Sequence, residues 1–231
     1  MLEQLKQDVL QANLDLVRHG LVTLTWGNVS GIDRSSGWIV IKPSGVAYGA
    51  LTPGDMVVVD LQGKTVEGSL RPSSDTPAHL CLYNACPLIG GIAHTHSPYA
   101  TMFAQSCREI PCLGTTHADQ FHGPVPLARF LSEEEVQDDY EANMGRVIVE
   151  RFRGLDWQSI PGVLLAGHAP FTWGTSAADA VLHAVALERI AHMAFGTLRL
   201  NPEAPELPRY ILAKHHRRKH GPDAYYGQKK S

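Results

Sequence analysis

The sequence lacks several features that mark particular classes of protein. Its 231 residues have a formal net charge of only −3 at pH 7, so no overall positive charge is present to attract nucleic acid. No segment approaches the roughly 18 consecutive apolar residues that a membrane-spanning helix needs. Internal repeats, low-complexity tracts and linker-like stretches are also missing. These absences predict a protein whose partners include neither nucleic acid nor a membrane.

Paired cysteine motifs are absent as well. The four cysteines, Cys81, Cys86, Cys107 and Cys112, form no C-x-x-C pair and stand among apolar neighbours. This spacing indicates neither a zinc ribbon nor a disulfide framework, and it predicts buried, reduced thiols. The first residues, Met-Leu-Glu-Gln-Leu-Lys, lack the basic region and apolar core of a signal peptide. We therefore expect a cytoplasmic protein.

The residues that are present describe an ordinary globular protein, with 44% hydrophobic and 19% charged residues. A chain of this length can bury a sizeable core, and we predict a single domain that spans residues 1–231. Histidine is the exception in this composition, because it occurs 12 times.

Apolar periodicity predicts the main helices and strands. Residues at spacings of three and four predict an amphipathic helix that begins near Leu2 and ends near Gly20. Short apolar runs predict strands within residues 38–41, 56–60, 90–97 and 161–168. Further helices are predicted to open within 71–77 and run through Tyr83, and to span 98–106, 133–152 and 176–199. On the last of these, His183 and His192 are expected to be packed or solvated.

Two histidines lie at the end of the predicted strand in residues 90–97, which reads Gly-Gly-Ile-Ala-His-Thr-His-Ser. His94 and His96 point to the same face of a strand, with Cα atoms roughly 6.5 to 7 Å apart, so their imidazoles can converge on one metal ion. A later short strand ends at His168. A pair of polar residues at a strand end is the structural alternative.

Two polar turns precede these histidines. Residues 25–30 read Thr-Trp-Gly-Asn-Val-Ser, and the strand at 38–41 leaves through Lys42-Pro43-Ser44-Gly45. Backbone amides freed by glycine, together with Asn28, Lys42 and Ser44, can cradle a phosphate without a Walker motif. Ordinary turn chemistry explains either segment equally well.

The helix that opens within residues 71–77 begins with Ser73, Ser74 and Asp75. Such residues can cap the helix, or they can hold an anion at its positive end. Asp75 is a candidate cap and a candidate metal ligand. His79 lies one turn later on a similar face, where it is a rival ligand or a packed side chain.

Two further segments concentrate polar and titratable groups. Residues 114–119, Gly-Thr-Thr-His-Ala-Asp, form a second polar turn, and residues 214–228 are strongly basic. The end of a chain is commonly a solvated tail, but two adjacent tyrosines at 225 and 226 argue against that interpretation here.

An aspartate and three histidines make a plausible zinc set. The candidates are Asp75, His94, His96 and His168. Four protein ligands can form a closed structural site, so catalysis requires that Asp75 be displaceable or that the metal expand its coordination.

At this point the chain resembles the L-ribulose-5-phosphate 4-epimerases, members of the class II aldolase family. The segments that support the resemblance extend from end to end: residues 21–30, 41–46, 71–76, 94–97 and 114–119, with Arg-Lys-His-Gly-Pro and Ala-Tyr-Tyr-Gly-Gln at the end. Related fuculose and rhamnulose phosphate aldolases look similar around the metal histidines. They have a glutamate near the place of Asp75 and lack the tyrosine tail.

The resemblance implies a three-layer α/β/α sandwich with a largely antiparallel central sheet. It further implies a C4 homotetramer with sites between subunits and a C-terminal catalytic tail at about residues 214–231. The implied zinc ligands are Asp75, His94, His96 and His168, with Mn²⁺ or Co²⁺ as substitutes for Zn²⁺. The implied phosphate-binding residues are Gly27, Asn28, Lys42, Ser44, Gly45, Ser73 and Ser74, and the implied acid/base pair is Asp119 and Tyr226. Gln120 and Ala169 depart from the family, which often has tyrosine and glycine at these positions.

The implied reaction converts L-ribulose 5-phosphate to D-xylulose 5-phosphate. C4 of this phosphorylated ketopentose has no acidic proton, so a retro-aldol cleavage of C3–C4 and re-formation after rotation explains its inversion. Such a path needs a Lewis acid for the enediolate and two proton-transfer groups on opposite sides. A zinc-dependent sugar-phosphate aldolase, a non-catalytic adducin-like structural domain and a metal-binding sensor are the alternatives.

Overall fold

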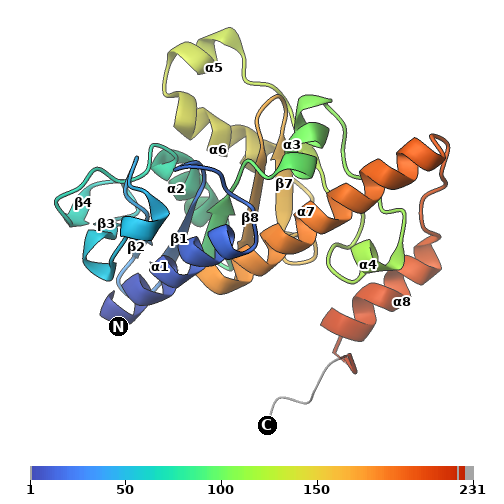
Figure 1. The fold of residues 1–231 in the computed structure, drawn as a ribbon, viewed down its shortest axis with the longest axis horizontal. Helices are drawn as coiled ribbons and strands as arrows, with labels where there is room; N and C mark the ends of the chain where they lie inside the picture. The colour runs from blue at the N-terminus through green and yellow to red at the C-terminus, as the bar shows by residue number, and fades with distance from the viewer. Residues whose placement is uncertain (1, 223, 227–231) are drawn as a thin grey trace.

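A computed structural model describes residues 2–222 and 224–226, and the sheet at its centre has eight strands in this part of the chain (Figure 1). The strand order is β4-β3-β2-β1-β5-β8-β7-β6. The bounds are β1 Asn28–Asp33, β2 Trp38–Ile41, β3 Val57–Val59, β4 Thr65–Glu67, β5 Gly91–His94, β6 Leu127–Ala128, β7 Gly162–Leu165 and β8 Pro170–Gly174. Neighbouring strands pair antiparallel except β6 and β7, which are parallel.

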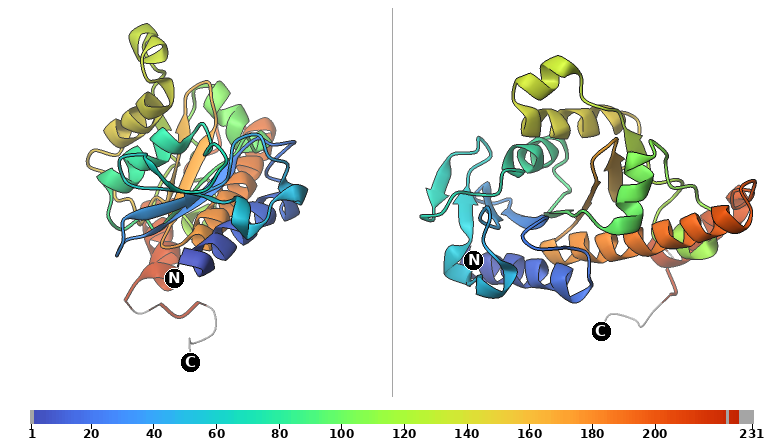
Figure 2. Two further views of the ribbon diagram at one scale, coloured as in Figure 1. Left: turned by 90° about the vertical axis from the view of Figure 1, so that its left-hand side faces the viewer. Right: turned by 45° about the horizontal axis from the view of Figure 1, so that its top comes forward.

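Helices cover both faces of this sheet (Figure 2). The helices are α1 Leu2–Arg18, α2 Thr76–Ala85, α3 Pro98–Gln105, α4 Thr115–Ala118, α5 Glu133–Gln137, α6 Tyr140–Arg151, α7 Ala177–Leu200 and α8 Arg209–His220, with short 3₁₀ turns at Tyr48–Ala50 and Pro53–Asp55. Side chains of α2 and α6 pack in one core cluster, and those of α1 and α7 pack in another. The predicted three-layer sandwich with a largely antiparallel sheet is therefore confirmed.

The predicted amphipathic pattern of α1 explains how β1 is held. Val9, Ala12 and Leu16 are buried on the inner face of the helix. Between them, the buried Asn13 side chain accepts a hydrogen bond from the Val29 N–H at 2.9 Å and donates one to the Val29 carbonyl at 3.2 Å. This pair of contacts fixes the start of β1, where the polar turn at residues 25–30 ends.

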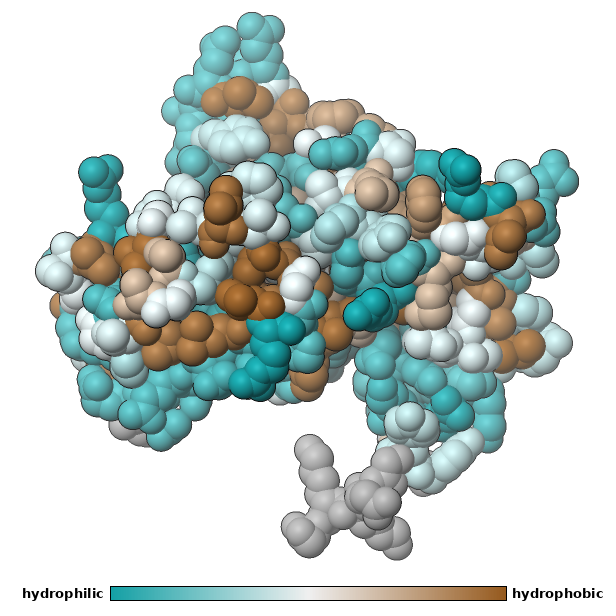
Figure 3. Space-filling view, in the orientation of Figure 1, coloured by the Kyte–Doolittle hydropathy of each residue, from teal (hydrophilic) through white to brown (hydrophobic). Residues whose placement is uncertain are grey.

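The local structure differs from the sequence prediction in three places. The helix expected at residues 133–152 is two helices, because Asp139 takes a left-handed conformation with φ 62° between α5 and α6. Residues 28–30, taken as part of the turn at 25–30, belong to the central strand β1. The basic C-terminal segment contains the helix α8, which the sequence did not predict, and Figure 3 shows a mainly hydrophilic surface there.

The cysteine prediction was correct in part. Cys86 and Cys112 are buried, Cys81 is half-buried, and Cys107 is exposed, so burial was wrong for Cys107. None of the four is paired in a disulfide. Among the residues that the structure describes, no helix combines the length and apolar character needed to cross a membrane.

Candidate active site

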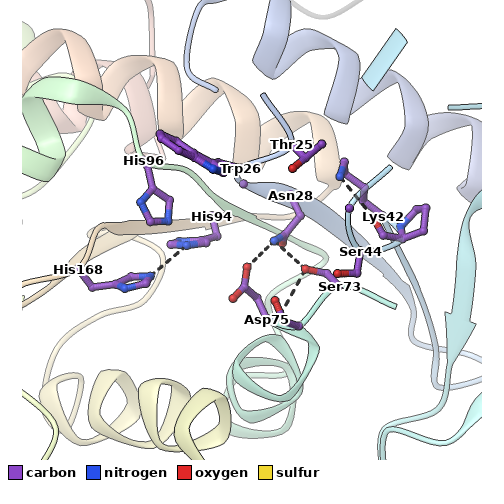
Figure 4. A pocket seen from close by; sticks show the side chains of 14 residues that line it. Thr25, Trp26, Asn28, Lys42, Ser44, Ser73, Asp75, His94, His96 and His168 are labelled. Atoms are coloured by element: carbon purple, nitrogen blue, oxygen red, sulfur yellow. Dashed lines mark hydrogen bonds between the residues drawn. The ribbon is translucent and has the colours of Figure 1, made fainter. Parts of the chain in front are cut away.

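A cavity of about 490 Å³ lies where β1, β2 and β5 meet the start of α2 (Figure 4). Every residue predicted for metal or phosphate binding lines it. These residues are Gly27, Asn28, Lys42, Ser44, Gly45, Ser73, Ser74, Asp75, His94, His96 and His168. In Figure 4 the histidines lie at one end and Lys42 and Ser44 at the other. Thr25, Trp26 and Pro43 also line the cavity, and the sequence had placed them only in the flanking turns.

The three histidines converge from separate elements. His94 is the last residue of β5, His96 follows two residues later, and His168 lies in the turn between β7 and β8. One ring nitrogen from each lies within 4.8 Å of the others. Nε2 of His94 and Nε2 of His168 are 3.3 Å apart. This separation suits nitrogen atoms that share one cation.

The tautomer of His94 follows from its surroundings. Its Nδ1 lies 3.0 Å from the Pro170 carbonyl oxygen, which can only accept a hydrogen bond. Nδ1 is therefore the protonated ring nitrogen and donates this hydrogen bond. The lone pair of Nε2 is therefore directed toward His168. Phe171 stacks on the His94 ring with a centroid distance of 4.2 Å and fixes its plane. Burial, reinforced by the charges of His94 and His96, lowers the pKa of His168 to about 4, so its imidazole is neutral at pH 7.

The chain after His96 is held by a helix far away in the sequence. Both carboxylate oxygens of Glu188, on α7, accept hydrogen bonds from the first N–H groups of α3, those of Tyr99 and Ala100, at 3.0 Å each. The turn that presents His96 at the exposed edge of the cavity is thereby anchored to the long helix.

Asp75 precedes α2, but its side chain makes no cap hydrogen bond to that helix. Instead its Oδ2 accepts a hydrogen bond of 2.6 Å from Asn28 Nδ2, which also donates to Ser73 Oγ at 3.0 Å. Burial alone would raise the pKa of Asp75, but the charges of His94 and His79 and the Asn28 contact outweigh it and lower the pKa. Among the described residues, the three histidines lie close enough together to hold a metal ion, and Asp75 does not belong to this cluster. In this arrangement Asp75 faces Asn28.

The other end of the cavity contains a buried cation. Lys42 is only 2% exposed, its Nζ donates to the Pro43 carbonyl at 3.3 Å, and it lies 4.8 Å from the centre of the Tyr48 ring. Burial lowers the pKa of Lys42, and no carboxylate among the described residues forms an ion pair with it. The nearby Asn28 Oδ1 is also buried without a partner in the described part of the chain. A buried cation without a counter-ion favours an anionic ligand.

Gly27 occupies a position that excludes other residues. Its φ of +78° is left-handed, and a Cβ there would lie 2.8 Å from the His94 carbonyl oxygen. The close approach of the 25–30 turn to β5 therefore requires glycine. This contact joins the phosphate-binding turn to the histidine strand.

The structure does not bring Asp119 and Tyr226 to this cavity, since neither residue lines it. Asp119 ends α4 and is bound by α8: His215 Nδ1 lies 3.0 Å from its Oδ1, and Arg218 donates to both of its oxygens. Tyr226 is 57% exposed, with the Arg218 guanidinium 5.0 Å from its ring centre. The two residues are thus neighbours of the same helix.

Comparison with known proteins identifies the family of the chain. Residues 7–195 match the model of the class II aldolase and adducin N-terminal domain. The chain is 54% identical over 228 residues to L-ribulose-5-phosphate 4-epimerase UlaF of Salmonella paratyphi B (strain ATCC BAA-1250 / SPB7), covering 99% of this chain and 100% of the relative.

Solved structures of aldolases have the same fold. An L-fuculose 1-phosphate aldolase matches with a TM-score of 0.78 and 25% identity, over 92% of this chain and 94% of the other. The l-fuculose-1-phosphate aldolase from Thermus thermophilus matches in fold with a TM-score of 0.66 and 23% identity, over 88% and 98%. The family model covers most of the chain, and the relative of 54% identity covers nearly all of it. The chain therefore belongs to the family of the class II aldolase and adducin N-terminal domain.

Proposed function

We propose that this protein is a metal-dependent L-ribulose-5-phosphate 4-epimerase, which produces D-xylulose 5-phosphate by breaking and re-forming the C3–C4 bond. One observation supports the proposal above all: a single cavity has three convergent imidazoles at one end and an unpaired buried lysine at the other. A phosphorylated sugar has the two groups that such a cavity would bind. The relative of 54% identity has this activity in its name and matches over nearly the whole chain.

The donor set fits a divalent metal. Neutral imidazole nitrogens are ligands of Zn²⁺ and also bind Mn²⁺ and Co²⁺, and the His94 tautomer leaves Nε2 free. We propose His94, His96 and His168 as ligands, with Asp75 as the oxygen ligand. When bound, the metal supplies Lewis-acid stabilisation of negative charge on the substrate oxygens.

The residues at the opposite end bind the phosphate. Lys42 provides the positive charge, and the side chains of Asn28, Ser44, Ser73 and Ser74 with the backbone of Gly27 and Gly45 provide hydrogen bonds. Space around Gly45 is open, because a Cβ there would meet no atom within 4 Å. The phosphate anchor holds the sugar so that its reacting carbons lie near the histidines.

Asp119 and Tyr226 are the proposed acid/base pair, and they act at the site of a neighbouring subunit. This proposal is supported by their absence from the lining of the cavity of their own chain and by their shared contact with α8. The protein would then be a homotetramer of single-domain subunits, each with a catalytic tail at about 214–231. Residues 223 and 227–231 of that tail lie outside the described residues. The cytoplasmic location stays a prediction from the sequence.

Incubation with L-ribulose 5-phosphate tests the function directly. We expect D-xylulose 5-phosphate to form when Zn²⁺, Mn²⁺ or Co²⁺ is present and not after chelation. Release of dihydroxyacetone and glycolaldehyde phosphate without an epimer would identify an aldolase. Absence of any product with all three metals would contradict the proposal and favour a non-catalytic role.

A further inference from the structure

A chain of buried hydrogen bonds lies outside the cavity lining, beside Asp75. The Tyr83 hydroxyl and Ser30 Oγ are 2.8 Å apart, and Ser30 Oγ is 2.7 Å from Nδ1 of His79. The three side chains are 1%, 0% and 0% exposed. Ser30 belongs to β1, whereas His79 and Tyr83 are one turn apart on α2. These hydrogen bonds therefore connect β1 of the sheet to α2, the helix that follows Asp75.

The other nitrogen of the His79 ring has no such contact. Nε2 is fully enclosed and lacks a hydrogen-bond partner among the described residues. A buried polar atom without a partner is costly and rare in folded proteins, so this nitrogen needs an explanation. The ring is thus fixed at one nitrogen and left available at the other.

The surroundings of the ring connect it to the histidine cavity. The His79 N–H donates to the Asp75 carbonyl at 3.2 Å, which places the two residues one helical turn apart on the same side. Phe171 contacts His79 edge-on at a centroid distance of 6.1 Å and stacks on His94. His79 therefore lies behind the cavity, next to the two groups proposed as metal ligands.

We propose that His79 is a positioning residue for Asp75: Nε2–H donates to the Asp75 carboxylate when the metal is bound. The inference rests on the proposed metal site. If the Tyr83 hydroxyl donates to Ser30, Ser30 donates to Nδ1, and the ring proton must then be on Nε2. A carboxylate can only accept, so this tautomer is the one that Asp75 requires. Partners of this kind orient a metal ligand and raise its affinity for the metal.

Two substitutions of His79 distinguish the roles of its two ring nitrogens. In His79→Gln the side-chain amide reaches the place of Nε2 and can donate there, whereas in His79→Asn it reaches only the place of Nδ1. Titration of the metal-free, full-length chain with Co²⁺, followed by visible absorption, measures binding without substrate. We expect a roughly 10- to 100-fold loss of affinity in His79→Asn and a much smaller loss in His79→Gln. His183→Gln is the matched control, because its Nδ1 contacts the Trp173 carbonyl away from the cavity.

A double-mutant cycle distinguishes positioning from a general structural role. If His79 acts through Asp75, His79→Asn should have little further effect on Co²⁺ affinity when Asp75 is already Asn. Equal losses in both backgrounds would overturn the proposal. If circular dichroism shows that His79→Asn does not fold, Tyr83→Phe is the second variant, because it removes the hydroxyl that bonds to Ser30. This variant should bind Co²⁺ several-fold more weakly than wild type. Unchanged Co²⁺ affinity in Tyr83→Phe would also overturn the proposal. A wild-type chain that binds no Co²⁺ would instead refute the metal site, and the role of His79 with it.

Discussion

Arg218 donates two parallel hydrogen bonds to the carboxylate of Asp119, from Nε to Oδ1 at 3.0 Å and from Nη2 to Oδ2 at 2.7 Å. This bidentate pair joins α8 to the end of α4, and His215 and His220 of the same helix reinforce it. Burial alone would raise the pKa of Asp119, but Arg218 and His215 outweigh that effect and lower the pKa. The proposed catalytic carboxylate is thereby kept ionised and fixed to the segment before Tyr226.

Replacing Arg218 by alanine should destabilise the protein at pH 7, because a charge-assisted, partly exposed contact is lost. A carboxylate whose pKa is lowered on folding adds stability above its unfolded pKa, and this contribution disappears as the pH falls through the folded pKa. The difference between wild type and variant should therefore shrink at pH 3 or below. Urea unfolding at both pH values measures it. Arg217→Ala, an exposed neighbour on α8, should have a much smaller effect.

Removal of the metal should abolish epimerisation, and adding Zn²⁺ or Co²⁺ should restore it, because the proposed reaction needs a Lewis acid beside the three histidines. His96→Asn should weaken metal binding sharply, since it removes one imidazole of the cluster. Equilibrium dialysis gives the metal content of each protein. His19→Asn, an exposed change on the first turn after α1, is the control. Full turnover by rigorously metal-free protein would contradict the metal role.

Lys42→Met should raise KM for the phosphorylated sugar by roughly 10- to 100-fold with little change in kcat, because a contact between a charged donor and the phosphate is lost. Initial rates over a wide substrate range measure both constants. Lys64→Met, an exposed change in the loop before β4, should leave both constants unchanged. A variant that keeps its KM but loses turnover at saturation would assign Lys42 to the chemistry instead.

His117 is expected to make folding stability depend on pH. Burial lowers its pKa to about 4, although its contact with the Gly123 carbonyl at 2.7 Å opposes this effect. Between about pH 4 and 6.5 the unfolded chain binds a proton that the folded chain does not, so stability should fall as the pH falls through this range. His117→Gln should reduce the slope by up to about 1.4 kcal/mol per pH unit. Denaturant titrations across this range test it, with His19→Gln as control, and an unchanged slope would refute the assignment.

Mixed oligomers test whether Tyr226 acts in a neighbouring subunit. A His96→Asn chain keeps its tyrosine, and a Tyr226→Phe chain keeps its metal ligands. If the tail acts in trans, unfolding the two inactive proteins together and refolding them should restore part of the activity, because some interfaces then pair two intact components. If mixed assembly is verified by mass spectrometry and no activity returns, the site is not shared.

The predicted strands that proved correct had a strong local signal. Residues 38–41 form an uninterrupted apolar run, and β2 has the bounds that this run suggests. β1 has no comparable signal, because Asn-Val-Ser-Gly-Ile-Asp is buried on both faces without alternation. Asn28 and Ser30 tolerate burial there through contacts with Ser73 and His79, which are 45 and 49 residues away. Such contacts are invisible to a local pattern.

The candidate site was more predictable in its members than in its geometry. Each predicted metal or phosphate residue lines one cavity, because the motifs stand where strands or a helix begin or end. The direction of the Asp75 side chain was open in the sequence, and its contact with Asn28 rather than with α2 depends on how β1 lies against that helix. The absence of Asp119 and Tyr226 from the cavity lining likewise depends on α8, whose sequence has one short apolar run before a long basic stretch and so lacks an apolar period.

Asn28 and His94 are direct partners in the register of β1 and β5. Neighbouring strands lie roughly 4.8 Å apart, and their backbone hydrogen bonds hold that spacing. One partner belongs to the proposed phosphate pocket and the other to the histidine cluster, so the separation of the two ends is set by the sheet. A sugar that reaches both ends must have a matching number of carbons between its phosphate and its chelating oxygens. Chain-length discrimination would thus reside in the backbone, where substitutions of the surrounding side chains cannot easily retune it.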